Sequence, residues 1–543
     1  MFEEPLFQDN IMEHIIKYMS YYLGYENWFM IFCGVLLFLY LCYKFLMYHN
    51  NVSYKGDFPA EEYKFSLKDK KEIWAFVFLI LCVIFNIFAI FSQEMSFFDS
   101  YDTGGQVLPL LETGVTPAWG AWGRFSPLAF WDTNILYAVT HHFWVMDIYL
   151  SIQSLIIVLL LNCFLKFISV WKRLVCIGLI MISPVVFSIS SIIYAEKLLL
   201  MYIIGSLIFM QKYSEQPDKK CFLWFAILLI NFALYSKELS VLFYFGILFY
   251  YSVNHISSGR LVPSSFFHPI KTARNYPFEA LLFLSIAIFA LLYKAIMYYF
   301  FTSTYISFRK MELLDLLQIY YTEMTVSIVV LFVFIKELFV KKKCIFMEGM
   351  ALGTLFITAV LVFILKIGHP VFSMFYKSYY LIIPYIIGLI YILWHLKSRW
   401  IIALISCALF INSIVRDYVI YNHEDGSAYR EIAEFVMSGN ETSKVNVFIS
   451  NHSENGDWYI FARRLPFAYY WPNADINFFF PNADLESIGW YKKRKVFYKE
   501  VPDSGDYFVI RKGIYYSQDI KEISSKESQK VFENKIFEVY LIK

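Results

Sequence analysis

The sequence predicts an all-α polytopic membrane protein with about twelve transmembrane helices, followed by a small α/β domain outside the membrane. Three observations lead to this prediction. Hydrophobic residues make up 59% of the 543 residues and charged residues only 17%, and the mean hydropathy is +0.51, so the apolar residues are too many for one buried core. Basic residues gather in every second loop. After residue 423 the composition changes to polar segments that alternate with short strand-like runs.

The apolar segments define the expected spans, since about 20 helical residues cross the hydrocarbon layer of a membrane. They lie at 28–48, 73–92, 146–165, 174–193, 198–211, 221–235, 239–254, 279–301, 322–340, 344–365, 379–396 and 400–418. Several of these segments are shorter than a full span, so neighbouring pairs could instead be re-entrant.

The basic residues orient the spans, because cytoplasmic loops carry an excess of Lys and Arg. One alternating set of loops holds about nineteen basic residues and the other set about seven. The sequence therefore predicts that both termini, a long loop at 93–145 and the tail face the outer side of the membrane. It predicts two domains, a multi-span domain at 1–423 and a soluble α/β domain at 424–543.

The net charge, the cysteines and the N-terminus argue against a nucleic-acid-binding protein, a disulfide-linked or cysteine-rich metal-binding protein, and a cleaved signal peptide. The net charge of +2 gives no reason to expect nucleic acid as a partner. All eight cysteines lie within apolar segments, so neither a disulfide framework nor a metal-ligand spacing is predicted. The acidic start of the chain has no basic region before the first span, so that span is not expected to be a cleaved signal peptide.

The tail predicts a helix through Met437 and five strands. A capping Ser427 begins the helix, and a second helix is possible near 457–470. The strand-like runs lie at 445–450, 476–480, 495–499, 506–511 and 535–542. Alternation of helices and strands favours an α/β domain of about 120 residues.

The outward loop after the second span contains the most informative polar residues. Asp99 and Asp102 follow the membrane edge directly, and Arg124 is the only cation of the loop. Partial desolvation at the edge would raise the pKa of these carboxyls toward the range of a general base. The alternative is an ordinary polar loop.

Two short outward turns carry further ionisable residues. Glu196 follows Tyr194 and Ala195 in one turn, and Lys237 and Glu238 follow Ser236 in the other. Ionisable groups flanked by spans usually face a cavity, where they bind each other or a ligand. The alternative is a salt bridge that only closes each turn.

A later outward loop carries Lys377 and Tyr379 before a proline-containing span. Cations on this side suit a phosphate head group, to which Arg presents a bidentate contact and Lys a point charge. Interaction of these side chains with lipid phosphates explains them equally well.

Together these features resemble the GT-C superfamily of integral-membrane glycosyltransferases, which use sugars linked to polyprenyl phosphate. The matching segments are Asp99-Ser100-Tyr101-Asp102, Tyr194-Ala195-Glu196, Ser236-Lys237-Glu238, Tyr376-Lys377-Ser378-Tyr379-Tyr380 and the outer C-terminal domain. The stretch Gly123-Arg124-Phe125-Ser126-Pro127-Leu128 is similar to membrane glucosyltransferases that modify bacterial O-antigen in lipopolysaccharide. The chain departs from the family in two ways: an additional span, 28–48, precedes the acidic loop, and the two acids are spaced Asp-x-x-Asp.

The resemblance implies sugar transfer, with inversion, to an envelope glycan or a lipid-linked acceptor on the outer face of a bacterial inner membrane. Asp99 is then the expected base and Asp102 its assistant. The expected donor-binding residues are Arg124, Glu196, Lys237, Glu238, Lys377 and Tyr379. No cofactor is required, although Mg²⁺ or Mn²⁺ bound by Asp99, Asp102 and Glu196 stays open.

Two rival functions remain at this point. The first is a polymerase or ligase of lipid-linked glycans, which would have a similar number of spans. The second is a flippase or transporter, which would favour inverted repeats and helices broken at the membrane midplane. The sequence shows no internal repeat, and its ionisable residues cluster outside rather than within the spans.

Overall fold

The computed structural model describes most of the hydrophobic part of the chain and the strands of the tail. The described residues are 28–48, 63–66, 68–92, 127–140, 142–187, 189, 195–258, 268–300, 321–339, 344–361, 381–423, 426–438, 444–449, 467, 471, 474–480, 496–499, 501–512, 528–535 and 537–543. The chain divides into two compact units, and the division in its C-terminal half falls between Asp417 and Tyr418. The predicted domain boundary at 423/424 stays a prediction.

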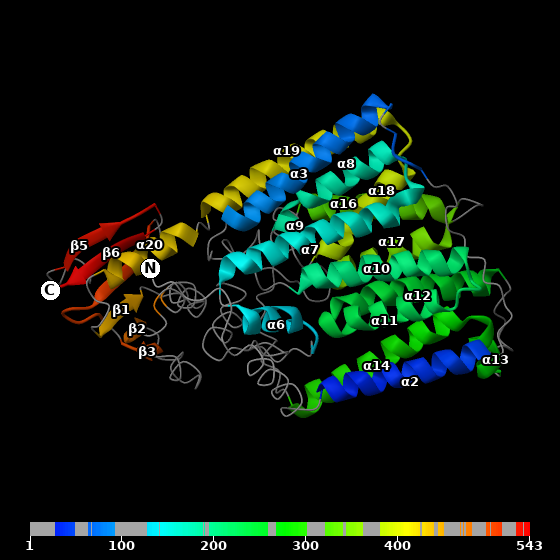
Figure 1. Ribbon diagram of the computed structural model, residues 1–543, viewed down its shortest axis with the longest axis horizontal. Helices are drawn as coiled ribbons and strands as arrows, with labels where there is room; N and C mark the ends of the chain where they lie inside the picture. The colour runs from blue at the N-terminus through cyan, green and yellow to red at the C-terminus, as the bar shows by residue number, and fades with distance from the viewer. Residues whose placement is uncertain are drawn as a thin grey trace. The chain divides into compact units, whose positions relative to one another are not determined.

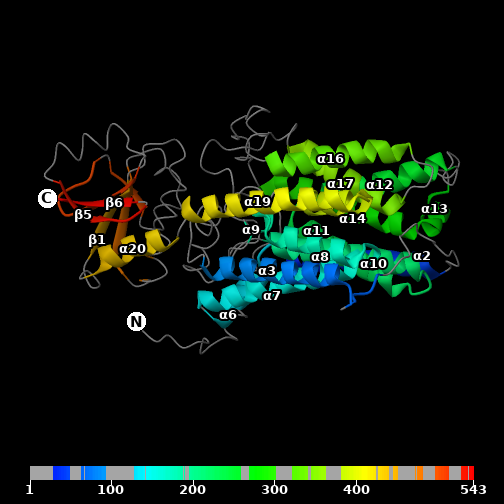
Figure 2. The ribbon, with the colours of Figure 1, turned by 90° about the horizontal axis from the view of Figure 1, so that it is seen from above.

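The first unit is helical (Figures 1 and 2). Its described helices are α2 (Trp28–Tyr48), α3 (Lys70–Ser92), α6 (Trp131–Val139), α7 (Phe143–Phe164), the 3₁₀ turn η1 (Leu165–Phe167), α8 (Val170–Met181), α9 (Pro184–Phe187), α10 (Glu196–Glu215), α11 (Cys221–Ser236), α12 (Leu239–Ser257), α13 (Pro269–Asn275), α14 (Pro277–Phe300), α16 (Tyr321–Leu338), α17 (Ile345–Ala359), α18 (Ile382–His395) and α19 (Arg399–His423). Every apolar segment expected from the sequence contains helix. The long helices run along one common direction, as Figure 2 shows.

Five of the described helices are long and apolar enough to cross a membrane: Met30–Tyr48, Lys70–Phe91, Trp144–Phe167, Leu239–Ser257 and Pro277–Ala295. Four further apolar helices are shorter, at Cys221–Ser236, Ile345–Ala359, Ile382–His395 and Arg399–Val415. The chain is therefore a mostly helical protein with several candidate membrane spans, and the full number of twelve crossings stays a prediction.

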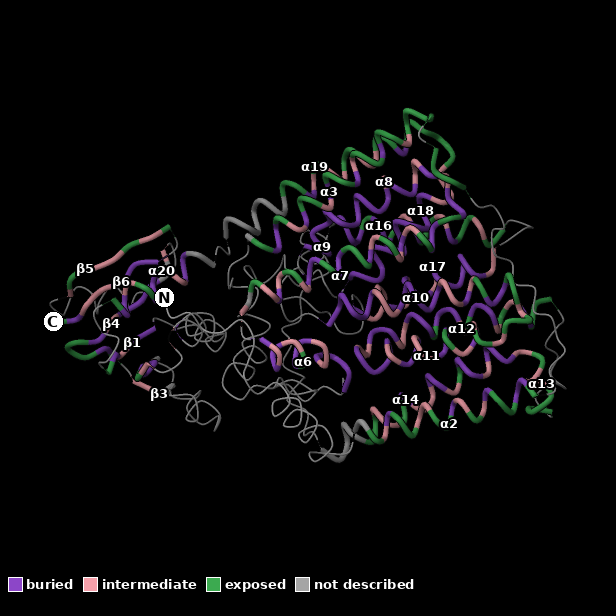
Figure 3. The backbone as a smooth tube through the Cα atoms, viewed as in Figure 1, coloured by how far each residue is buried: buried purple, intermediate pink, exposed green. Residues whose placement is uncertain are grey.

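Burial distinguishes the inner helices of this unit from the outer ones (Figure 3). Every residue of α18 from Ile382 to Leu393 is buried. By contrast, α3 exposes Trp74 and Phe88, and α19 exposes Trp400 and Leu404. Large apolar side chains on outer helix faces are unfavourable in water but fit a lipid environment.

The closest helix contact in the inner part joins α12 to α17. A Cβ atom added to Gly353 would lie 2.5 Å from the backbone oxygen of Phe243. Nearer the other end of the contact, one added to Gly349 would lie 3.5 Å from Ile247 and Tyr251. As the numbering rises in one helix it falls in the other, so the two helices are antiparallel. Glycine at the crossing lets the backbones approach, as is common between membrane helices.

The expected span at 174–193 is interrupted. Helix α8 ends at Met181, and Pro184 begins the short α9. Ser183 stabilises the break, because its Oγ donates to the oxygen of Ile180 at 2.7 Å and accepts from the N–H of Val186 at 3.3 Å. Proline is favoured at a helix start and disfavoured within a helix, which explains a break that hydropathy did not predict.

The described part of the tail contains α20 (Gly426–Met437) and six strands: β1 (Val445–Ile449), β2 (Ile476–Phe480), β3 (Val496–Tyr498), β4 (Tyr507–Arg511), β5 (Ser528–Glu533) and β6 (Phe537–Ile542). They form one sheet in the order β3-β2-β1-β4-β6-β5. The first four strands pair in parallel, and β6 pairs antiparallel with β4 and β5. All five expected strands are present, while β5 was missed; the second expected helix lies almost entirely outside the described residues.

A network of polar side chains links β2, β1 and the residue just before β4. Asn477 donates to Asn446 at 3.1 Å, and Asn446 donates to Asp506 at 3.1 Å. Asp506 is 1% exposed and also forms an ion pair with Lys499. Burial opposes the charge of Lys499, but its hydrogen bonds to Asp506 and Asp503 outweigh this effect and raise its pKa. A buried carboxylate is tolerated because its partners satisfy it.

Candidate functional site

An ion pair between Glu196 and Lys237 joins the adjacent ends of α10 and α11. The Nζ atom of Lys237 donates to Oε1 of Glu196. The side chain of Glu196 is 3% exposed and that of Lys237 is 14% exposed. Two of the residues selected from separate turns of the sequence therefore lie together in a largely buried position.

Local helix geometry explains where these two charges lie. Glu196 is the first residue of α10, and Lys237 directly follows the last residue of α11. A helix N-terminus favours a negative charge and a helix C-terminus a positive one. Since α10 and α11 pack against each other, both helix dipoles favour this arrangement of the pair.

A second lysine, Lys197, is fully buried next to this pair. Its Nζ atom lies 3.3 Å from Oγ of Ser154 and 3.4 Å from the backbone oxygen of Leu150, both on α7. Asp147, one turn earlier on α7, interacts with it electrostatically. Lys197 was not among the site residues expected from the sequence, although it directly follows Glu196 in the short turn between two apolar segments, where a charge is costly.

The short helix α6 adds a half-buried carboxyl group to the same end of the bundle. Asp132 accepts hydrogen bonds from Tyr149 at 2.8 Å and from Gln153 at 3.1 Å. Burial raises the pKa of Asp132, while these two hydrogen bonds act in the opposite direction. Gln153 precedes Ser154, the partner of Lys197, so neighbouring residues of α7 contact Asp132 and Lys197.

Further contacts fix α6 and the end of the predicted loop 93–145 to this region. The indole of Trp131 donates to the hydroxyl of Tyr202 on α10 at 3.2 Å. The N–H of Leu128 donates to the backbone oxygen of Tyr235, two residues before Lys237, at 3.1 Å. The described residues at which the loop returns to the helices are thus anchored beside the Glu196–Lys237 pair. Sequence analysis treated 93–145 as one loop and missed α6.

The remaining selected residues do not all have a described position. Glu238 directly precedes α12 and is half-buried. The other five selected residues lie outside the described part of the chain: Asp99, Asp102, Arg124, Lys377 and Tyr379. Of the three expected metal ligands only Glu196 is described, and its Oε1 binds Lys237.

We call the set Asp132, Glu196, Lys197 and Lys237 the Glu196 cluster. Its members come from α6, from the start of α10 and from the end of α11. A fully buried lysine and a largely buried one can bind an anionic oxygen, and a half-buried carboxyl with a raised pKa can accept a proton. This combination suits transfer chemistry at a phosphate ester. No model of a known protein family matches the chain, and no curated protein sequence matches it.

Proposed function

We propose that this chain is a membrane glycosyltransferase of the GT-C type. It moves a sugar from a polyprenyl-phosphate donor to an envelope glycan or lipid-linked acceptor at the outer face of a bacterial inner membrane. The observation that carries the proposal is the buried Glu196–Lys237 pair beside the point where the outward loop returns to the helices. Ionisable residues buried at the end of a membrane bundle usually belong to a functional site.

Lys237 and Lys197 supply the positive charge that a leaving phosphate requires. In the transfer, the acceptor hydroxyl oxygen bonds to the anomeric carbon as the bond from that carbon to the phosphate oxygen breaks. Polyprenyl phosphate leaves with the electron pair, and a nearby cation stabilises the developing charge. Glu196 holds Lys237 in position through their ion pair, and Arg124 and Lys377 are further candidates for the phosphate.

The proton of the acceptor hydroxyl passes to a carboxylate, for which Asp99 is the proposed base and Asp102 its assistant. A base is required because a sugar hydroxyl is a weak nucleophile at neutral pH. One displacement at the anomeric carbon inverts its configuration, as in inverting enzymes that use no covalent intermediate. Glu238 and Tyr379 are proposed to bind the sugar, and a divalent cation held by Asp99, Asp102 and Glu196 is an option that removal with a chelator tests.

A transfer assay in proteoliposomes tests this function. Purified protein is supplied with polyprenyl-phosphate sugars and envelope glycolipids, and the sugar-bearing product is measured. The proposal expects product with the wild-type chain and at least a hundredfold loss with Asp99→Asn. Asp218→Asn is the control, because Asp218 is an exposed residue between α10 and α11. Normal transfer by Asp99→Asn would refute the assigned base, and movement of the lipid across the bilayer without transfer would favour a flippase.

A further inference from the structure

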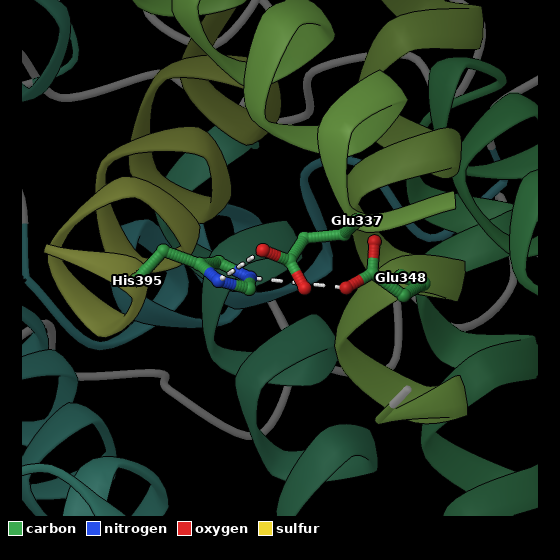
Figure 4. Close-up of side chains that lie close together, drawn as sticks. All are labelled: Glu337, Glu348 and His395. Atoms are coloured by element: carbon green, nitrogen blue, oxygen red, sulfur yellow. Dashed lines mark ion pairs between the residues drawn. The ribbon is translucent and has the colours of Figure 1, made fainter. Parts of the chain in front are cut away.

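Two glutamates and a histidine meet where three helices of the first unit end. Glu337 lies in the last turn of α16, Glu348 in the first turn of α17, and His395 at the end of α18. These three helices pack against one another. Figure 4 shows the imidazole of His395 facing both carboxylates.

The distances within this trio are longer than hydrogen bonds. His395 Nδ1 lies 3.5 Å from Glu337 Oε1, and His395 Nε2 lies 3.7 Å from Glu348 Oε1. One ligand atom from each residue lies within 4.8 Å of the others. Zinc binds imidazole nitrogen and carboxylate oxygen at about 2.0–2.2 Å, so two ligands of one ion lie roughly 3–4 Å apart. One ion binds only one nitrogen of an imidazole, and the 3.7 Å between His395 Nε2 and Glu348 Oε1 matches that spacing. The three ligand atoms lie within 4.8 Å of one another, so Glu337 moves closer to Nε2 when the ion binds.

The surroundings of the trio match a metal site in a second way. The Nε2 atom of His395 is buried and has no hydrogen-bond partner among the described residues. Glu348 is 2% exposed, and its Oε2 accepts a hydrogen bond of 2.5 Å from Tyr391. Such a hydrogen bond orients a carboxylate that ligates a metal through its other oxygen. The aromatic rings of Tyr391 and Trp394 lie against His395, with centroids 4.6 and 4.5 Å away.

A second histidine–glutamate pair shows what a purely structural contact looks like in this protein. His255 Nε2 lies 2.9 Å from Glu279 Oε1, which is hydrogen-bond distance. Among the described residues the only three-residue group of suitable ligands is the trio of Glu337, Glu348 and His395. Lys336 lies 3.9 Å from Glu337 and is 78% exposed, so it competes weakly with a bound ion.

This trio lies far from the Glu196 cluster. Helix α12 begins two residues after Lys237 and runs antiparallel to α17, with Tyr250 electrostatically coupled to Glu348. At 1.5 Å per residue, Tyr250 lies roughly 17 Å along the axis from the first residue of α12. The two sites are therefore at different levels of the bundle, and the metal site does not depend on the proposed function.

We propose that Glu337, Glu348 and His395 bind a divalent transition metal ion, with Zn²⁺ as the expected occupant. Imidazole together with carboxylates suits Zn²⁺ better than Mg²⁺, which prefers oxygen ligands alone. Because each ligand comes from a different helix, the ion joins the ends of α16, α17 and α18. It is a structural site that fixes the ends of three helices that pack against one another.

Metal titration of the full-length chain tests the proposal. The protein is purified in detergent without a histidine tag, treated with a chelator and titrated with Zn²⁺ by calorimetry, and Co²⁺ is added separately to record its visible absorption. We expect one high-affinity site per chain and a Co²⁺ spectrum typical of four- or five-coordinate nitrogen and oxygen ligands. We expect His395→Gln and Glu348→Gln each to weaken Zn²⁺ binding at least tenfold and to remove the Co²⁺ spectrum.

The matched control is His255→Gln, which removes a buried histidine that contacts only one carboxylate. It is expected to leave both the affinity and the spectrum unchanged. Two outcomes would overturn the proposal: a wild-type chain with no high-affinity site, or binding that survives in His395→Gln. If Glu348→Gln fails to fold, Glu337→Gln serves in its place, since Glu337 lies nearer the surface and its loss is expected to weaken Zn²⁺ binding by a similar factor.

Discussion

Two glycines one turn apart on α17 respond differently to the same substitution. At Gly353 a Cβ atom would lie 2.5 Å from the backbone oxygen of Phe243 and 2.9 Å from its ring atom Cδ2. At Gly349 the nearest atoms would lie 3.5 Å away, which is an ordinary van der Waals distance. Because the clash at Gly353 is with backbone, α12 and α17 must separate to relieve it.

The expected magnitudes follow from this geometry. Overpacking in a close-packed interior costs about 1–3 kcal/mol, while alanine gains about 0.5–1 kcal/mol over glycine within a helix. Gly353→Ala is therefore expected to lower the free energy of unfolding by about 1–2 kcal/mol. Gly349→Ala has no clash to offset the gain and is expected to be neutral or to stabilise the protein by up to about 1 kcal/mol.

Reversible unfolding of the purified chain in mixed detergent micelles, followed by circular dichroism, measures both variants. A third variant, Gly34→Ala, controls for the effect of glycine in an exposed helix, because nothing lies within 4 Å of its added Cβ. Equal stability of the Gly353 and Gly349 variants would refute the close crossing of α12 and α17.

Three further predictions concern side chains. Asp506→Ala breaks the buried network of the sheet and is expected to lower the free energy of unfolding in urea by about 3–5 kcal/mol. Asp503→Ala removes a side chain that is 73% exposed and should lower it by less than about 1 kcal/mol. Similar values for the two variants would contradict the network. Tyr149→Phe removes a hydrogen bond to Asp132 and should lower the free energy of unfolding by about 1–3 kcal/mol. The Tm should fall as a result, and an unchanged Tm would contradict that contact. Hydrogen bonds from two lysines lower the pKa of Glu533 to about 2, so its stabilising effect is full above pH 4.5 and is lost as the pH falls through about 2. Glu533→Gln should therefore reduce the dependence of the free energy of unfolding on pH in that window. An unaltered dependence would argue against these hydrogen bonds.

Much of the helical architecture is predictable from the sequence because lipid-facing helices require long apolar segments. Helix α2 covers the same residues as the first predicted span, since hydropathy alone determines such a segment. The break before Pro184 was not predicted, because the flanking residues are mostly apolar and the hydropathy of a segment does not depend on backbone geometry. Helix α6 was missed because nine residues inside a polar loop give too weak a periodic signal.

Whether a strand of the tail could be predicted likewise depended on its residue composition. The runs that became β1, β2 and β4 are rich in Val, Ile and Phe, which is typical of buried strands. Strand β5 has the sequence SQKVFE and is mostly exposed or half-buried, so its composition does not distinguish it from a loop. Strand β5 forms because it pairs with β6, and this pairing cannot be predicted from the residues of β5 alone.

The candidate site was predictable in its residue types but not in its partners. Glu196 and Lys237 were selected because charges are costly between apolar segments, and the packing of α10 against α11 then brings them together. Lys197 and Asp132 were missed, because only the tertiary arrangement shows that both contact α7. Similarly, Glu348 and His395 are far apart in sequence, and only the packing of α17 against α18 reveals that they are neighbours.

The central claim is that the Glu196–Lys237 end of the bundle binds the phosphate of a polyprenyl donor. Photo-crosslinking tests it directly, with a polyprenyl-phosphate analogue that carries a diazirine next to the phosphate and with peptide mapping of the labelled chain. We expect labelling of peptides that contain Glu196 or Lys237, and this labelling should be suppressed by excess unlabelled polyprenyl phosphate and reduced in Lys237→Gln. Competable labelling confined to the end that contains Glu348 and His395 would contradict it.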